Sequence, residues 1–258
     1  MVVHVIETPP RVGAGDRLEP VSGALLFARF AAPPNSLGYC GGDDHRALVD
    51  QLRAGVDGPD LVRLCRAFEG AWPYLRLIAT SAGFPDPLDR RVVEAYWIGN
   101  SLLDQVSPAA FAVDLERRFR PRTARNEWPW LVAKSVQGSL PHHSFHVLEV
   151  MPRIGLLRAG HVAAILPSME QCLIRPARVI ASDDAGLLVH TRPLVVVQGR
   201  LAFGPPVEQR VADGEVAARP GDDIAIHWGW SCGRLSAWQR SELVGITATA
   251  MQRANETI

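Results

Sequence analysis

The pattern of residues changes near position 140, and this change constrains the fold more than any other feature of the chain. Before it, apolar residues recur at helical spacing, and the runs end at Gly or Pro. After it, short apolar runs are separated by turn signals, which is typical of a small barrel. The expected helices are 22–32, 43–54, 60–68, 72–82, 87–103, 108–119 and 236–254, and the expected strands are 144–151, 178–182, 187–191, 194–198, 201–203, 207–211 and 223–228.

These runs predict an α+β protein in three parts. An N-terminal helical domain spans residues 1–135, and its first helix is expected to end before Pro33 and Pro34, because proline lacks the N–H that continues a helix. A connecting segment over 136–170 carries a cluster of histidines. A small β-barrel with a C-terminal helix follows over 171–258.

Charge and apolar patterning exclude several classes of protein. The 27 Lys and Arg residues balance 27 Asp and Glu residues, whereas nucleic-acid binders usually carry a basic excess, so no nucleic-acid partner is expected. The sequence contains no run of about 18 apolar residues, which a membrane span would need. The first residues also lack the pattern of a signal peptide. We therefore expect a cytoplasmic protein with no membrane partner, in which the cysteines stay reduced.

Two motifs in the C-terminal part are specific. The first is Gln-Cys-Leu-Ile-Arg-Pro-Ala-Arg-Val over 171–179, and the second is Pro-Gly-Asp-Asp-Ile-Ala-Ile-His-Trp-Gly over 220–229, followed by Arg-Leu and a helix. Together they resemble the HypC/HupF family of hydrogenase maturation chaperones across residues 171–254. The whole chain also resembles an uncharacterised actinobacterial family with Phe-Ala-Arg-Phe, Gly-Tyr-Cys-Gly and His-His-Ser-Phe-His motifs.

The HypC/HupF resemblance implies an OB-like barrel that binds iron during assembly of a nickel–iron site. The implied partners are a hydrogenase large subunit or another maturation protein. The family's essential cysteine maps onto Cys172, and its strand histidine maps onto His227. In the family that cysteine becomes the N-terminal residue, whereas 171 residues precede Cys172 here, so it has no free α-amine.

The chemistry of Cys172 agrees with this implied role. A thiolate is a soft ligand that suits iron, copper or zinc. Arg175 and Arg178 are expected to supply positive charge that favours the thiolate. The alternative is that Cys172 is a small buried apolar residue at the start of a strand.

The densest group of metal-ligating side chains is the histidine cluster His142, His143 and His146. A strand would pair His142 with His146 on one face, and a helix would pair the same two residues through their i, i+4 spacing. Neutral imidazoles bind iron, nickel, copper or zinc, so His142 and His146 are candidate ligands, and Glu149 is a candidate carboxylate. The alternative is a loop-to-strand junction with one buried histidine.

Cys40 is a candidate nucleophile in the glycine-rich run Gly-Tyr-Cys-Gly-Gly. A helix expected to begin near Asp43 would lower the pKa of its thiol through the helix N-terminus. One of the clustered histidines, His143 or His146, would then act as the base, which makes all three catalytic candidates. The alternative is a tight turn with a buried thiol.

Two functions of different classes follow. In the first, the protein is an accessory or assembly protein for nickel–iron hydrogenase maturation, and the helical half selects the client. In the second, it is a metal- or haem-dependent biosynthetic enzyme with its site between the halves, using Cys40 and the histidine cluster. A structural interaction module without any ligand is a third interpretation.

Overall fold

The computed structural model describes residues 21–121, 133–135, 137–150, 162–214 and 216–256. Parts of the expected helical domain and of the connecting segment therefore lie outside the described residues. Within the described ranges, helices come first and an antiparallel sheet follows, so the expected α+β class is confirmed. The helices are α1 (Gly23–Ser36), α2 (Ala47–Ala54), α3 (Pro59–Arg66), α4 (Trp72–Ser81), α5 (Arg90–Trp97), η1 (Leu103–Gln105), α6 (Pro108–Phe119), α8 (His143–Phe145), η2 (His146–Val150), α9 (Val162–Cys172) and α10 (Ala237–Asn255).

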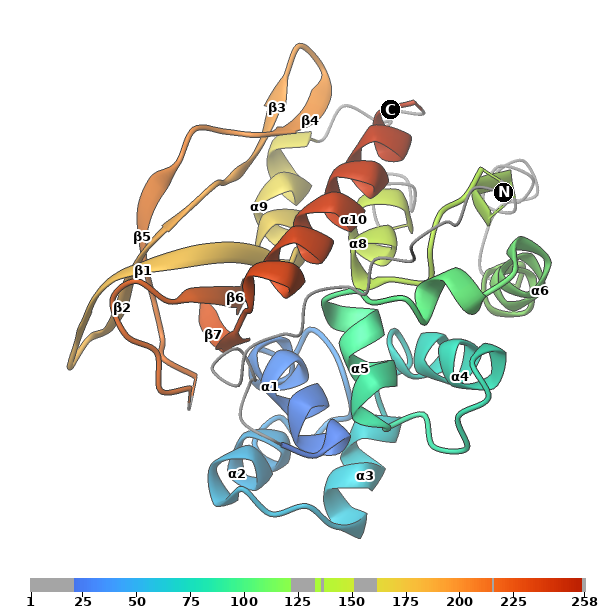
Figure 1. Cartoon of the computed structure of the whole chain (residues 1–258), viewed down its shortest axis with the longest axis horizontal. Coiled ribbons are helices and arrows are strands. Elements are labelled where there is room, and N and C mark those ends of the chain that lie inside the picture. The colour runs from blue at the N-terminus through green and yellow to red at the C-terminus, as the bar shows by residue number, and fades with distance from the viewer. Residues whose placement is uncertain (1–20, 122–132, 136, 151–161, 215, 257–258) are drawn as a thin grey trace, which may run out of the picture.

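The N-terminal helices gather around α1, which packs against α2, α3 and α5 (Figure 1). The hydroxyl of Ser22 caps the first turn of α1 by accepting a hydrogen bond from the Leu25 N–H. Apolar side chains of α1 face inward, and the Phe30 ring stacks on Trp97 of α5 with centroids 5.4 Å apart. Buried aromatic rings therefore hold the two central helices of this half together.

Two helix ends differ from expectation. The chain was expected to leave the helix at Pro33, but α1 includes both prolines because they lie in its last turn, where few carbonyls still need a helical N–H. The helix expected over 87–103 instead ends at Trp97. The reason is Gly99, whose φ of +108° no helix accommodates.

In the part of the chain that the structure describes, seven strands follow α9. They are β1 (Arg175–Asp183), β2 (Gly186–Thr191), β3 (Leu194–Val197), β4 (Arg200–Phe203), β5 (Val207–Val211), β6 (Asp223–His227) and β7 (Trp230–Arg234). Six of them overlap expected strands, whereas β7 and α9 were not expected.

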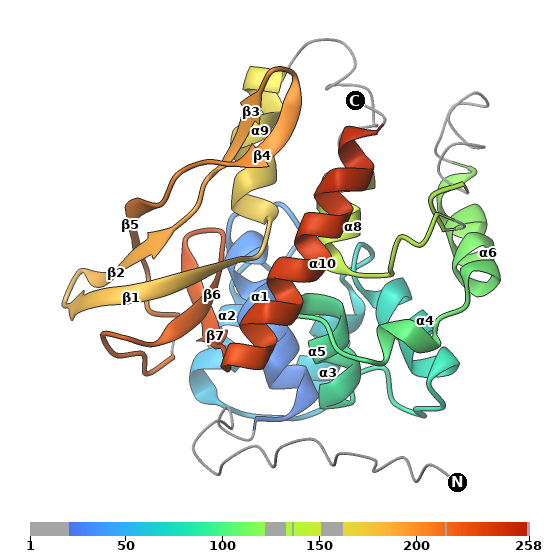
Figure 2. The ribbon, with the colours of Figure 1, turned by 45° about the horizontal axis from the view of Figure 1, so that its top comes forward.

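The strands form a five-stranded antiparallel sheet in the order β5-β2-β1-β6-β7, and β3 pairs with β4 in a separate hairpin (Figure 2). The expected closed barrel is not formed. Within the described residues, the edge strands β5 and β7 meet only through one parallel bridge, between Ala212 and Trp230. Because β5 ends at Val211, only one residue of the chain beyond it reaches β7.

The expected closing helix is confirmed as α10, which runs between the sheet and the N-terminal helices (Figure 1). The Ser236 hydroxyl and the Gln239 side chain cap its first turn reciprocally. Leu243 of α10 belongs to the same buried cluster as Phe27 of α1 and Ala225 of β6. The helical half and the sheet therefore share one core.

The prediction of a strand over 144–151 is wrong. This segment forms the short helix α8 and then η2, which is a π-helix. The ring of His142 starts α8, because its Nδ1 accepts a hydrogen bond from the Ser144 N–H at 3.0 Å. A short apolar run in the sequence does not distinguish a strand from a buried helix. The hydrogen bond from the Ser144 N–H to the His142 ring favours the helix here. None of the helices in the described ranges is both long and apolar enough to cross a bilayer.

Candidate metal centre

His143, Cys172 and His227 meet at one buried point, although they come from three separate parts of the chain. One ligand atom of each lies within 4.8 Å of the other two, and all three residues are buried. His143 begins α8, Cys172 ends α9, and His227 ends β6. Two nitrogen donors and one sulfur donor of this kind suit iron, zinc or copper.

His227 is oriented by the helical half. Its Nδ1–H donates to the carbonyl of Phe30 at 2.7 Å, so Nδ1 carries the proton and Nε2 carries the lone pair. That Nε2 atom is buried and has no hydrogen-bond partner among the described residues. Burial, followed by the neighbouring His143, lowers the pKa of His227 to about 3, so the ring is neutral and able to bind a metal.

The Phe30 carbonyl is available because of Pro34. In a regular helix this carbonyl would accept the N–H four residues later, and proline has no N–H. Pro34 of α1 therefore has a consequence at the site. A backbone carbonyl that fixes the tautomer of a metal-binding histidine is a frequent partner of metal ligands.

His143 is held at both ring nitrogens. Nδ1 lies 3.2 Å from the Tyr96 hydroxyl, and Nε2 lies 2.9 Å from the Cys172 carbonyl. Because a carbonyl only accepts, Nε2 carries the proton in this arrangement, and Nδ1 accepts from Tyr96. For Nε2 to bind a metal, the proton has to sit on Nδ1 instead, and the Tyr96 hydroxyl can then accept from it.

The Cys172 thiol is neutral in this setting. Burial raises its pKa to about 12. The prediction that Arg175 and Arg178 supply positive charge to the thiolate is wrong. Arg175 pairs with Glu170 at 3.2 Å, and Arg178 pairs with Asp223 at 3.5 Å. A bound cation is then the charge that would displace the thiol proton.

The distances fit a small ion. Tetrahedral zinc with its usual bond lengths holds a nitrogen and a sulfur about 3.6 Å apart. Nε2 of His143 lies 3.8 Å from Sγ of Cys172. The widest separation in the group is within 4.8 Å, so side-chain movements of about 1 Å bring all three atoms to one ion.

Aromatic rings surround the centre. The Trp97 ring lies 4.8 Å from the His143 ring and 5.9 Å from the His227 ring. The two histidine rings are 5.2 Å apart and nearly perpendicular. Burial lowers the pKa of His143 to about 4, so neither imidazole competes with a cation through its own charge at neutral pH.

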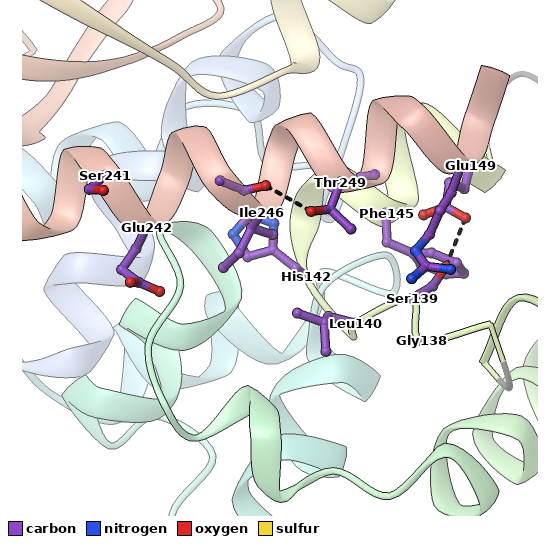
Figure 3. A pocket seen from close by; sticks show the side chains of 13 residues that line it. Gly138, Ser139, Leu140, His142, Phe145, Glu149, Ser241, Glu242, Ile246 and Thr249 are labelled. Atoms are coloured by element: carbon purple, nitrogen blue, oxygen red, sulfur yellow. Dashed lines mark hydrogen bonds between the residues drawn. The ribbon is translucent and has the colours of Figure 1, made fainter.

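His142 lies elsewhere, in the wall of a cavity of about 340 Å³ between α10 and the segment that leads into α8 (Figure 3). Glu149 lines the same cavity and accepts a hydrogen bond from the Ser139 hydroxyl at 2.8 Å. It also faces the ammonium of Lys134 at 3.7 Å, and both side chains are buried. Glu149, the candidate carboxylate ligand, therefore belongs to a buried ion pair and not to the group of His143.

His146 also lies outside the group that His143 forms with Cys172 and His227. Its ring packs edge-on against Tyr74 with centroids 6.1 Å apart. Burial, followed by His143, lowers its pKa to about 3. The structure thus separates the three clustered histidines, since only His143 joins the sulfur.

Cys40 lies in the segment between α1 and α2. The helix expected to begin near Asp43 begins at Ala47 instead, so its N-terminus does not activate the thiol. Burial of the thiol raises the pKa of Cys40, which is opposite to the expected direction. The carbonyl of Cys40 accepts a hydrogen bond from the buried Asn35 amide at 2.8 Å.

Sequence reasoning named Cys172, His227 and His143, but it missed the residues that orient them. Tyr96 lies in the helix expected over 87–103, with no role assigned to its hydroxyl, and Pro34 marks only an expected helix end. A tyrosine in a buried helix face, whose hydroxyl needs a partner, is the signal that would have pointed to Tyr96. The relation of Pro34 to His227 depends on tertiary packing and has no signal in the sequence.

No curated protein and no solved structure matches the chain. The family model described as "Family of unknown function (DUF6390)" matches residues 19–258. This match confirms the expectation of an uncharacterised family, and it covers both the helical half and the sheet. The chain belongs to the DUF6390 family of unknown function.

Proposed function

We propose that the protein is an accessory protein of nickel–iron hydrogenase maturation, in which the His143–Cys172–His227 centre holds an iron fragment. One observation carries the proposal. Cys172 and His227 are the two positions singled out by the HypC/HupF resemblance, and they meet with a third donor at one buried point. Neighbouring positions of the motifs are also in contact, since the Trp228 N–H donates to the Gln171 carbonyl at 2.9 Å.

The donor set supports iron as cargo. A thiolate with neutral imidazoles is a set that binds iron well. Cys172 has no α-amine to offer, and Nε2 of His143 supplies a nitrogen donor 3.8 Å from its sulfur. The buried position would keep water away from a reactive iron fragment. The hydrogenase large subunit, or another maturation protein, is the proposed partner.

The experiment is metal analysis and an optical spectrum of protein purified without oxygen. Wild type is compared with Cys172→Ala, and Cys65→Ala is the matched control because Cys65 is a buried thiol of the helical core. We expect iron in wild type and in the control, and its loss in Cys172→Ala. A pull-down with a hydrogenase large subunit tests the client. Wild type that holds no iron and captures no large subunit contradicts the proposal.

A second function, a metal-dependent biosynthetic enzyme, is favoured by the place of the centre. His227 is hydrogen-bonded to Phe30 of α1, and His143 is hydrogen-bonded to Tyr96 of α5. The centre therefore lies where the sheet meets the helical half. An enzyme keeps a metal position open for its substrate. Metal-dependent turnover of a small molecule that is lost in His143→Ala, without capture of a large subunit, would favour this function.

A further inference from the structure

We infer that the cavity beside α10 binds a short linear zwitterion of tripeptide size, with its ammonium at Glu242 and its carboxylate at Arg253. The inference does not depend on the metal centre. The cavity has a volume of about 340 Å³, which is within the range of pockets that hold small ligands. One face of α10 and the segment 138–149 make its walls (Figure 3).

The two charged residues that α10 contributes lie far apart along the cavity. Glu242 and Arg253 are separated by about 16 Å along the axis of α10. Figure 3 shows Glu242 at one end of the lining, and Ser139 and Glu149 at the other. Both side chains extend into the gap, and an extended chain of three residues spans about 10 Å. A ligand of that length reaches both charges.

The Arg253 guanidinium lies against the segment that leads into α8. A Cβ atom on Gly138 would lie only 3.1 Å from its Nη2 atom, so glycine leaves the room that the guanidinium occupies. A guanidinium has five N–H donors in a planar fork, so it can bind a carboxylate in addition to its contacts within the protein. Lys134 compensates the charge of the nearby Glu149 at 3.7 Å, so Glu149 does not exclude an anion from this end.

Glu242 supplies the opposite charge at the other end. It is half-buried, and among the described residues no ion pair or hydrogen bond involves its carboxylate. An ammonium is the group that pairs best with a carboxylate in such a wall. A ligand with one ammonium and one carboxylate therefore matches both ends, and it adds no net charge to the cavity.

The middle of the cavity suits a narrow chain with small apolar groups. The side chains of Leu140, Phe145, Ile246 and Ala250 line this part. They offer apolar surface to a ligand, whereas the charged groups lie toward the ends. The lining thus combines an apolar wall with a few polar groups, which is typical of small-molecule sites.

Gly245 is the observation that points to an occupant. It lies in the middle of α10 and lines the cavity. Glycine weakens the interior of a helix relative to alanine. A Cβ atom at this position would meet nothing within 4 Å, so the packing of the described residues does not require glycine. A ligand that passes close to the helix backbone accounts for it.

The test is isothermal titration of the full-length protein with trialanine and with two blocked forms of it. N-acetyl-trialanine lacks the ammonium, and trialanine amide lacks the carboxylate. We expect wild type to bind trialanine about tenfold more tightly than either blocked form, because each blocked form loses one charge-assisted contact.

Variants assign each end of the ligand. In Arg253→Gln, trialanine and trialanine amide should bind equally, because the carboxylate has lost its partner. In Glu242→Gln, trialanine and N-acetyl-trialanine should bind equally for the corresponding reason. Gly245→Leu should abolish binding by filling the cavity, and it is expected to fold because the position has room and leucine favours the helix. Arg240→Gln is the matched control, since Arg240 is an exposed residue of α10 outside the cavity.

Three outcomes would overturn the inference. They are wild type that binds none of the probes, equal binding of all three probes by wild type, and unchanged binding of trialanine by Gly245→Leu. The comparison of probes on wild type stands even if a variant fails to fold, which circular dichroism checks. None of these results bears on the metal centre, because His143, Cys172 and His227 do not line this cavity.

Discussion

The Nδ1 atom of His227 lies 2.7 Å from the carbonyl oxygen of Phe30, a carbonyl that the helix leaves available because residue 34 is proline. This contact joins the end of β6 to the last turns of α1. It fixes which nitrogen of His227 carries the proton, and it presents the other nitrogen to Cys172 and His143. A break in one helix thereby orients a candidate ligand on a strand.

Replacing Pro34 tests this relation. In Pro34→Ala a backbone N–H returns to compete for the Phe30 carbonyl, so His227 loses its fixed orientation. We expect metal affinity to fall about tenfold, in the range found for lost partners of metal-binding histidines. Competition with a chromogenic chelator measures the affinity. Pro33→Ala is the control, because its N–H faces the carbonyl of residue 29; an equal loss of affinity in both variants would contradict the relation.

Cys172→Ala should abolish thiolate ligation and lower metal affinity by orders of magnitude, because it removes the one sulfur of the three-residue group. Cys65→Ala should keep the affinity of wild type, although that thiol is equally buried and its pKa is likewise raised to about 12. Isothermal titration with zinc compares the variants. Retention of sulfur-to-metal absorption by Cys172→Ala would show that the sulfur donor is another cysteine.

Much of the fold was predictable because its signals are local. Ser22, Ser107 and Ser236 cap helices where the sequence predicts their starts, since a hydroxyl satisfies an N–H of the first turn whatever the rest of the chain does. The π-helix after His142 and the open edge between β5 and β7 depend on packing between distant residues. No run of neighbouring residues encodes them.

The candidate site was predictable only in part. Motif positions pointed to Cys172 and His227, but sequence spacing paired His142 with His146 in either a strand or a helix. The ligand that meets the sulfur is His143, because α8 begins at His143 and directs its ring toward Tyr96 and Cys172. Which face of a one-turn helix meets a distant strand is a tertiary property.

Tyr96→Phe tests the positioning of His143. The variant keeps the buried ring but removes the hydroxyl 3.2 Å from Nδ1, so the tautomer that frees Nε2 loses its partner. We expect metal affinity to fall by about tenfold or less with a small change in unfolding free energy. Tyr74→Phe is the matched control, because it removes a hydroxyl from the same buried aromatic cluster, whereas both ring nitrogens of His143 contact other residues. Equal affinities of wild type and Tyr96→Phe would remove Tyr96 from the site.

Metal affinity should rise with pH. The pKa of Cys172 is about 12, so the thiol is protonated at neutral pH, and each metal bound displaces its proton. Metal affinity then rises about tenfold per pH unit for each thiol proton that the metal displaces. The histidines of the centre, with pKa values of about 3 and 4, are already neutral and add nothing to this slope. Titrations at pH 6.5, 7.5 and 8.5, each in two buffers that differ in ionisation enthalpy, measure the slope and the proton released. Affinity independent of pH would contradict a neutral thiol at the centre.

The fold itself should lose stability in mild acid. His142, His143, His146 and His227 have pKa values lowered to between about 3 and 4, mainly by burial. In the unfolded chain each takes up a proton near pH 6.5, whereas in the folded protein each resists it. The stability that neutral histidines provide is therefore complete above pH 6.5 and is lost as the pH falls toward 4. The loss per histidine is up to about 1.4 kcal/mol per pH unit.

Urea denaturation at pH 7.5, 6.0 and 5.0 measures this loss, and His146→Leu identifies the source. His146 lies outside the group that meets Cys172, and its Nδ1 atom has no hydrogen-bond partner among the described residues, so leucine at this position keeps an apolar contact with Tyr74 and removes one titrating ring. The unfolding free energy of His146→Leu should fall less steeply with acid than that of wild type. His190→Leu is the control, because it removes an exposed imidazole and not a buried one. If His146→Leu and wild type lose stability in parallel, carboxylates and not buried imidazoles govern the acid response.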